Sequence, residues 1–205
     1  MSALMTLLVL WSFVVGPPGL SPSKGSDGRQ KMSTMTEAEW DANDQARDAR
    51  YQLDKALDAV GVKPRTIVGE VGAGAGYVVF KLSARVGPSG KVYAEDIVAS
   101  FLNMLKARAT HRGLANIETV LGTPEDAKLP AATFDLIFMH ATIQFIDKPV
   151  AMLNSLTRCL KPGGKIVVVE RARAEYISAF RETGLKVNRL DDTLVPPFAV
   201  YVLSR

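Results

Sequence analysis

The stretch IVGEVGAGAGY, residues 67–77, predicts a strand, a tight turn and the start of a helix. A β-branched run comes first, and Gly72, Gly74 and Gly76 follow at alternate positions. Glycine adopts positive φ angles without strain and has no Cβ to keep a ligand away. The first N–H groups of a helix have no partner within the helix and suit polar or anionic ligand groups. The stretch therefore predicts a loop that holds a nucleotide-like ligand.

Strand and helix patterns alternate along the chain on both sides of this loop. A stripe made by Leu53, Ala56, Leu57 and Val60 predicts an amphipathic helix before the first strand. Strands are expected at residues 66–71, 91–97, 117–121, 134–139, 165–170, 185–190 and 198–203. The last two have no helix between them, which is typical of an antiparallel hairpin. The pattern predicts an α/β fold with a doubly wound, mostly parallel seven-stranded sheet, an antiparallel C-terminal hairpin and a three-layer sandwich of helix, sheet and helix.

Composition and charge restrict the class of protein. The chain has 205 residues, of which 47% are hydrophobic and 22% charged, enough for one domain with a substantial core. The net charge is +4, but the lysines and arginines are scattered among acids, so nucleic-acid binding is not expected. The chain has one cysteine, Cys159, so no disulfide can form within it. Cys159 lies in an apolar helical pattern, which predicts that its side chain is buried.

The N-terminal region, residues 1–35, is expected to be a signal-like or anchor segment followed by a flexible linker, with the folded domain at 36–205. Residues 3–15 are apolar, and a segment rich in Pro, Gly and Ser follows. The run is shorter than the roughly 20 residues that span a bilayer, so a secretory signal fits better than a membrane span. The prediction is a secreted, periplasmic or membrane-anchored protein. The alternative is a cytoplasmic protein whose working start is Met32.

An acidic residue marks the end of the second predicted strand. In open parallel sheets, ligands bind beyond the carboxyl ends of the strands, at the point where the strand order reverses. Asp96 is expected there, beside the glycine loop, where a carboxylate can accept hydrogen bonds from both hydroxyls of a ribose. A one-residue shift of the strand end would give this role to Glu95, and a solvated turn acid is the other interpretation.

At this point the sequence resembles a known family. Glu70 precedes the glycines, whose spacing is G-x-G-x-G, and this motif is similar to the first motif of S-adenosylmethionine-dependent methyltransferases of the Rossmann-like class I, small stand-alone type. Three further matches follow in the family's order: VYAEDI at 92–97, FDLI at 134–137 and LKPGGK at 160–165. The resemblance covers about residues 61–170.

The resemblance implies S-adenosyl-L-methionine as the cofactor and a set of cofactor-binding residues. It implies that the glycine loop lies against the methionine moiety, that Glu70 organises the amino end and that Asp96 binds the ribose. Many relatives have an acid after the third strand that meets the adenine amino group; Asp126 is the nearest counterpart, with Glu125 beside it. The residues implied to bind the cofactor are Glu70, Gly72, Gly74, Gly76, Asp96, Ile97 and Asp126.

The end of the fourth predicted strand departs from the family. Relatives often have an acid and a histidine pair there, whereas this chain has Gln144 and Phe145. Methyl transfer from a sulfonium is an in-line displacement that depends mainly on positioning, and it needs a base only when the acceptor must lose a proton. His140, at the carboxyl end of that strand, is the candidate catalytic base. A packed or cofactor-flanking histidine is the alternative.

The predicted function is methyl transfer from S-adenosylmethionine to a small-molecule substrate, because no additional module for a large acceptor is evident. The sequence contains no metal-ligand spacing of His, Cys or carboxylates. Two alternatives stay open: a NAD-type Rossmann oxidoreductase, and a non-catalytic protein that binds S-adenosylmethionine. The methyl acceptor and the oligomeric state are not predicted.

Overall fold

The computed structural model describes residues 34–190 and 193–205. The apolar run at residues 3–15, expected to act in export or anchoring, lies outside the described residues. No helix in the described part of the chain is long and apolar enough to cross a membrane.

The chain divides into two compact units, Met1–Ala42 and Asn43–Arg205. In the first unit, the start of helix α2 carries a capping box: the N–H of Glu39 donates to Oγ1 of Thr36 (3.3 Å), and the N–H of Thr36 donates to Oε2 of Glu39 (2.7 Å). The second unit contains the sheet and every residue of the candidate site.

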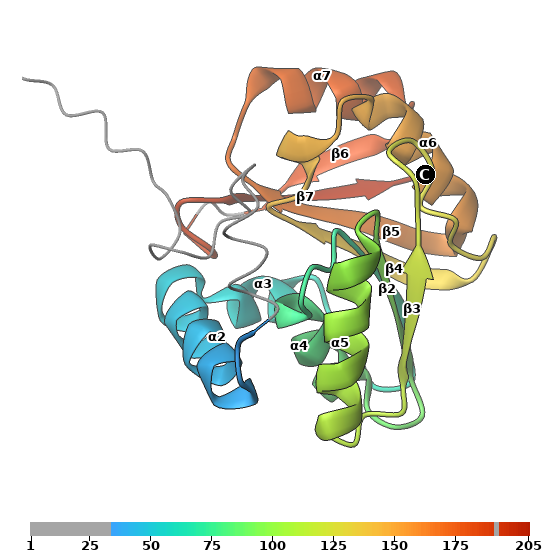
Figure 1. Ribbon diagram of the computed structural model, residues 1–205. Coiled ribbons are helices and arrows are strands. Elements are labelled where there is room, and N and C mark those ends of the chain that lie inside the picture. The colour runs from blue at the N-terminus through green and yellow to red at the C-terminus, as the bar shows by residue number, and fades with distance from the viewer. Residues whose placement is uncertain (1–33, 191–192) are drawn as a thin grey trace, which may run out of the picture. The chain divides into compact units, whose positions relative to one another are not determined.

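Seven strands form one sheet in the order β3-β2-β1-β4-β5-β7-β6 (Figure 1). They are β1 (Ile67–Val71), β2 (Lys91–Asp96), β3 (Ile117–Leu121), β4 (Phe134–His140), β5 (Leu160–Glu170), β6 (Lys186–Arg189) and β7 (Ala199–Ser204). All neighbours from β3 to β5 are parallel, and β7 is antiparallel to both β5 and β6. The predicted fold class and the C-terminal hairpin are confirmed.

Helices cover both faces of the sheet (Figure 1). The helices are α2 (Glu37–Tyr51), α3 (Leu53–Ala59), α4 (Tyr77–Val86), α5 (Ala99–His111), the short 3-10 helix η1 (Ile143–Phe145), α6 (Pro149–Cys159) and α7 (Ala174–Glu182). One buried apolar cluster joins α3, α4 and α5 to one face, and a second joins α6 and α7 to the other. Side chains alternate across a strand, so β1 sends Val68 into the first cluster and Val71 into the second.

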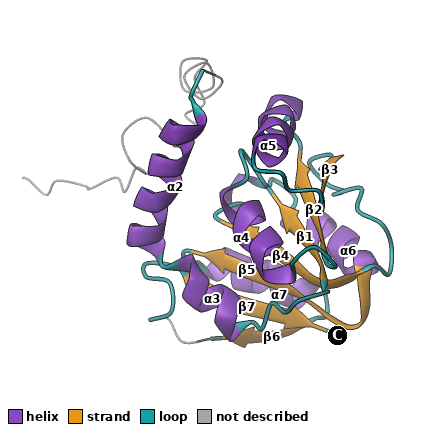
Figure 2. Cartoon of the chain, turned by 90° about the horizontal axis from the view of Figure 1, so that it is seen from below, coloured by secondary structure: helices purple, strands orange, loops and turns teal. Residues whose placement is uncertain are grey.

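The strand order reverses between β1 and β4, which are the two central neighbours in the sheet (Figure 2). The chain winds outward from β1 to the edge strand β3 and then returns to β4. This reversal separates the loops that follow β1 and β4, and such a crevice at the carboxyl ends is where open α/β sheets bind ligands. The glycine loop follows β1 at this point.

Two local features were not expected from the sequence. Gln52 has φ 48° and separates the expected amphipathic helix, which is α3, from the preceding helix α2. Strand β5 begins at Leu160, five residues before the strand expected at 165–170, and its pairing with β4 shifts register between Phe134 and Leu136. Gly163 has φ 79°, and a Cβ on Gly164 would lie 2.6 Å from the carbonyl oxygen of Phe134. Glycines therefore allow the irregular strand to stay in the sheet.

Candidate active site

The glycine loop between β1 and α4 has three residues in the left-handed region. Gly72, Gly74 and Gly76 have φ angles of 77°, 53° and 100°. A Cβ on Gly72 would lie 2.4 Å from side-chain atoms of Thr142, and a Cβ on Gly76 would lie 2.8 Å from the Phe80 ring. A Cβ on Gly74 would meet no atom within 4 Å. Two glycines thus allow close packing of the loop, and Gly74 faces open space where a ligand can approach.

Asp96, at the end of β2, holds this loop in place. Its Oδ2 accepts a hydrogen bond from the N–H of Gly74 (2.9 Å), and its Oδ1 accepts one from the N–H of Val98 (2.8 Å). Burial raises the pKa of the Asp96 carboxyl, and these backbone hydrogen bonds oppose the shift. A carboxylate has about four acceptor sites, so both oxygens retain capacity for two ligand hydroxyls. Ile97, the next residue, is 52% exposed, which leaves an apolar surface beside the carboxylate.

Glu70, at the end of β1, is 2% exposed, and its Oε2 has no hydrogen-bond partner among the described residues. Burial raises the pKa of this carboxyl well above its ordinary value, while the positive charge of Arg47 acts in the opposite direction. A buried polar atom without a partner is uncommon in folded proteins and calls for an explanation such as a missing ligand. Glu70 is therefore placed to receive a cationic group.

Two arginines that the sequence did not single out belong to this region. Arg47, on α2, lies over the Tyr77 ring with its Cζ 3.8 Å from the ring centroid. Arg108, on α5, is 4% exposed and donates from Nη1 to the carbonyl oxygen of Ala75 (2.7 Å) and from Nη2 to Asp44 (2.9 Å). Arg108 thus anchors the glycine loop from the neighbouring helix. Spacing along the sequence carries no signal for either role.

His140, at the end of β4, is buried among three aromatic rings. The centroid of its imidazole lies 5.9 Å from that of Tyr51, 6.1 Å from that of Tyr77 and 5.4 Å from that of Phe198. Neither ring nitrogen has a hydrogen-bond partner among the described residues. Burial, followed by the charge of Arg47, lowers the pKa of His140 to about 3. The ring is therefore neutral at ordinary pH, and as a base it is weak until its surroundings change.

Asp126 and Glu125, in the loop after β3, are both engaged at the surface. Oδ1 of Asp126 accepts from the N–H of Lys128 (2.9 Å), and Oδ2 lies 3.2 Å from Nζ of Lys128 and 3.8 Å from Nη2 of Arg158. Glu125 pairs with Nζ of Lys148 at 2.5 Å. The structure thus brings Glu70, the glycines and Asp96 together, whereas the carboxylate of Asp126 is bound within its own loop.

The segment after β4 contains the residues that stand where relatives often have histidines. Gln144 donates from Nε2 to the carbonyl oxygen of Ala141 (3.3 Å), and Phe145 is 60% exposed. An exposed phenyl ring at the carboxyl edge of the sheet offers an apolar surface to an acceptor.

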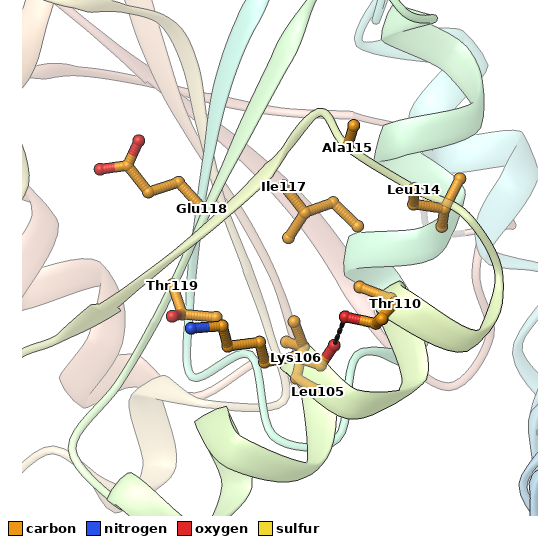
Figure 3. A pocket seen from close by; sticks show the side chains of 9 residues that line it. Leu105, Lys106, Thr110, Leu114, Ala115, Ile117, Glu118 and Thr119 are labelled. Carbon is orange, nitrogen blue, oxygen red and sulfur yellow. Dashed lines mark hydrogen bonds between the residues drawn. The ribbon is translucent and has the colours of Figure 1, made fainter.

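A separate hollow of about 380 Å³ lies between α5 and the edge strand β3 (Figure 3). Its lining includes Lys106, Thr110, Ile117 and Glu118, and the hydroxyl of Thr110 donates to the carbonyl oxygen of Lys106 (2.9 Å). None of the site residues predicted from the sequence lines it. Among the described residues, no group of three or more His, Cys, Asp or Glu side chains is arranged to hold a metal ion.

Comparison with known proteins identifies the family to which this site belongs. A family profile described as a methyltransferase domain matches residues 69–168, from β1 to β5. A solved structure of a SAM-dependent methyltransferase from Aquifex aeolicus superposes with a TM-score of 0.70 at 26% identity, over 83% of this chain and 98% of that one. These matches support a class I S-adenosylmethionine-dependent methyltransferase domain in this chain.

Two curated relatives are both named as methyltransferases. The nocamycin O-methyltransferase of Saccharothrix syringae is 28% identical over 142 residues, which are 69% of this chain and 51% of that protein. The ubiquinone/menaquinone biosynthesis C-methyltransferase UbiE of Escherichia fergusonii is 33% identical over 115 residues, 56% of this chain and 46% of that protein. The chain therefore spans about half the length of these relatives.

The methyltransferase family uses S-adenosyl-L-methionine as its cofactor, which supplies an activated methyl group on a sulfonium. The site residues fit this cofactor. Gly74 leaves room for a close approach, the Asp96 carboxylate has remaining acceptor capacity, and Oε2 of Glu70 is a buried acceptor with no partner in the described part of the chain. The family assignment favours this cofactor over the nicotinamide cofactor of the alternative considered from the sequence.

Proposed function

We propose that this chain transfers a methyl group from S-adenosylmethionine to a small-molecule acceptor. The observation that carries the proposal is a buried Glu70 carboxyl, whose Oε2 has no partner among the described residues, next to a glycine loop that Asp96 bonds at Gly74. Glu70 precedes the glycine loop and Asp96 bonds to it, so two carboxyl groups adjoin a surface that has no Cβ at Gly74. This arrangement suits a ligand with an ammonium group at one end and a ribose at the other.

Each group has a proposed role. Glu70 accepts the ammonium of the methionine moiety, the glycine loop lies against that moiety, and Asp96 accepts the two ribose hydroxyls. Ile97 covers the adenine through its exposed apolar side chain. Asp126 is proposed to meet the adenine amino group through acceptor capacity not used by Lys128, because a carboxylate oxygen can accept more than one hydrogen bond.

The transfer step is proposed to depend on alignment. Effective concentrations reached by aligned reacting groups account for a large part of such a rate enhancement, so the chain's main tasks are to position the acceptor and to exclude water. His140 is proposed to act at the acceptor side, where the ring nitrogen that carries no proton can accept a proton or a hydrogen bond from an acceptor hydroxyl, since neither nitrogen has a partner within residues 34–190 and 193–205. Phe145 is proposed to pack against the apolar part of the acceptor.

The names of the relatives support a small acceptor. One is an O-methyltransferase named for nocamycin and the other a C-methyltransferase of quinone biosynthesis. The matches cover 51% and 46% of these relatives, so the proposal concerns the class of acceptor, a small molecule. Isothermal titration with S-adenosylhomocysteine and with NAD tests the cofactor: binding of NAD alone would refute the proposal.

A turnover assay separates an enzyme from a binding protein without catalysis. Formation of S-adenosylhomocysteine is measured with a panel of phenols, enols and quinols, and Asp96→Asn serves as the control with impaired cofactor binding. Methylation that depends on Asp96 supports the enzyme. Tight cofactor binding with no turnover on any acceptor of the panel would favour the non-catalytic alternative.

We also propose that the apolar run at residues 3–15 directs export of the chain or anchors it in a membrane. The support is the length and hydrophobicity of the run and the Pro/Gly-rich segment that follows it. Cell fractionation of the full chain beside a chain that starts at Met32 tests this. Equal distribution of the two in the cytoplasm would contradict the proposal and support the later start.

A further inference from the structure

Glu95 is a buried acid beside the candidate site, and it faces away from Asp96. The two residues are neighbours on β2, and side chains alternate along a strand, so they point to opposite faces of the sheet. The partners of Glu95 in register are Val71, which lies in the second apolar cluster, and Val120, which packs against that cluster. Glu95 is 1% exposed, and its Oε1 has no hydrogen-bond partner among the described residues. A buried polar atom in such a place calls for an explanation.

The main chain at the end of β2 holds the two loops that flank it. The carbonyl oxygen of Glu95 accepts hydrogen bonds from the N–H groups of Gly72 (3.0 Å) and Ala73 (2.8 Å) in the glycine loop. The carbonyl oxygen of Asp96 accepts one from the N–H of Gly122 (3.2 Å), where the loop after β3 begins. Both loops adjoin the candidate site, so the end of β2 fixes their spacing.

The Glu95 side chain lies directly against Gly122. A Cβ on Gly122 would overlap Oε1 of Glu95 and would lie 2.8 Å from its Cδ, and the three atoms nearest to that Cβ all belong to Glu95. Gly122 is not among the glycines with positive φ, so its backbone conformation does not require glycine. The missing Cβ at residue 122 is thus what lets the carboxyl fit against the loop after β3.

The surroundings of this carboxyl favour its neutral form. Burial is the main reason that the pKa of Glu95 rises to about 8, and the charge of Asp96 adds to the shift. From the loop after β1, the N–H of Gly72 acts in the opposite direction. From the loop after β3, Asp126 adds a smaller negative contribution, and it is itself paired with Lys128. Both acids that act on Glu95 are negative, so they would repel a charged Glu95.

A neutral carboxyl can stay packed on Gly122, whereas an anion there would be buried beside two like charges with one oxygen unpartnered within the described residues. We propose that Glu95 is a positioning residue that, as a neutral carboxyl packed on Gly122, holds the loops after β1 and β3 in the arrangement that binds the cofactor. Loss of its proton releases the side chain from Gly122 and loosens the loop after β3. The inference rests on the proposed function and adds to it that cofactor affinity falls as the pH rises.

The test is isothermal titration of the full chain with S-adenosylhomocysteine at about pH 6.5 and about pH 9. With a pKa of about 8, roughly one-tenth of the protein has a neutral Glu95 at the higher pH. Glu95→Gln keeps the shape of the neutral carboxyl and has no proton to lose. The ammonium group of the probe also titrates in alkaline solution, but it does so equally with both proteins. The dissociation constant of the unchanged protein should therefore rise about tenfold more than that of Glu95→Gln.

Two further variants make the result specific. Gly122→Ala places a methyl group where the carboxyl lies, so it should weaken binding already at the lower pH and show no larger loss at the higher pH than Glu95→Gln does. Glu118→Gln removes an exposed acid of β3 that pairs with Lys91, and it should keep the pH dependence of the unchanged protein. Thermal unfolding at both pH values shows whether each protein is folded during the titration.

The outcomes separate the inference from the proposed function. Equal pH profiles for the unchanged protein and Glu95→Gln would overturn the inference, while binding by the unchanged protein at the lower pH supports the function. If Glu95→Gln does not fold, Gly122→Ala decides: full affinity of this variant at the lower pH overturns the inference, and weakened affinity supports it. If the unchanged protein binds the probe at neither pH, the proposed function fails and the inference fails with it.

Discussion

Oδ2 of Asp96 accepts a hydrogen bond from the N–H of Gly74 at 2.9 Å, which links the end of β2 to the loop after β1. One carboxylate thus fixes the open glycine and presents its remaining acceptor capacity to a ligand. Positioning of the loop and recognition of the ribose therefore depend on the same side chain.

Replacement of Asp96 by Ala is expected to weaken cofactor binding. The loss of hydrogen bonds to a charged group predicts about 1 to 3 kcal/mol of binding free energy. Titration of the variant with S-adenosylhomocysteine measures this change. Glu182→Gln, an exposed acid on α7, is the control and should bind normally. An unchanged dissociation constant for Asp96→Ala would refute the ribose assignment.

Replacement by alanine should destabilise the protein more at Gly72 than at Gly74. Both are in the left-handed region, which costs an L-residue roughly 1–2 kcal/mol. Only Gly72→Ala adds a clash, because its Cβ would lie 2.4 Å from side-chain atoms of Thr142. Urea unfolding should therefore show a larger loss for Gly72→Ala than for Gly74→Ala.

A double variant tests the cause of that difference. Gly72→Ala combined with Thr142→Ala removes the clashing atoms, so the pair should be less destabilised than the sum of the single changes. If the losses of unfolding free energy are additive, the backbone conformation at residue 72, and not the clash with Thr142, explains the effect of Gly72→Ala. Gly74→Ala should still lower cofactor affinity, since its methyl group points into open space beside the loop.

Arg108 is expected to be important for stability because it is buried and holds two partners. Breaking a buried ion pair from one side costs about 3–5 kcal/mol, so Arg108→Met should lower the free energy of unfolding by an amount near this range. Arg173→Met removes the surface pair with Glu175 and should cost less than about 1 kcal/mol. Equal effects of the two changes in urea unfolding would contradict the anchoring role of Arg108.

Because the pKa of Glu95 is raised, the folded protein is expected to lose stability as the pH rises. Burial, followed by the charge of Asp96, raises its pKa from 4.5 to about 8. Between these values the unfolded chain releases the proton while the folded chain retains it, so stability falls as pH rises from about 4.5 to about 8. Glu95→Gln should reduce this slope in urea unfolding at pH 5, 6.5 and 8. An identical slope in the variant would show that Glu95 does not titrate in this range.

Because the pKa of His140 is lowered, it is expected to make stability fall as the pH falls, which is the opposite of the effect of Glu95. The pKa of His140 falls from 6.5 in the unfolded chain to about 3 in the folded protein. Between these two pH values His140 is protonated in the unfolded chain and neutral in the folded protein. Stability due to the buried neutral ring is therefore lost as pH falls from about 6.5 to about 3. His140→Phe should lessen this loss in thermal unfolding at pH 4.5 relative to pH 7. If the role at the acceptor is correct, the same variant should bind S-adenosylhomocysteine but turn over more slowly.

The amino-acid sequence by itself determined the elements that depend on local patterns. The third strand, residues 117–121, was predicted with the bounds that the structure gives, and the helix start expected at the end of residues 67–77 is the start of α4 at Tyr77. The three glycines and Asp96 were expected from a strand, a turn and a strand end, and the resemblance to a known family added Glu70. The register of β1 with β2, which pairs Val71 with Glu95, then brings them together.

Only the tertiary structure decided which distant side chains meet. Arg108 and Asp44 are 64 residues apart, and Arg47 gains its place from Tyr77 on another helix. The burial of His140 between Tyr51 and Phe198 likewise depends on segments from opposite ends of the domain. Local periodicity and φ preferences act over a few residues, whereas these contacts arise when helices pack on the sheet. The glycine loop was thus readable from the sequence, and the charges and rings around it were not.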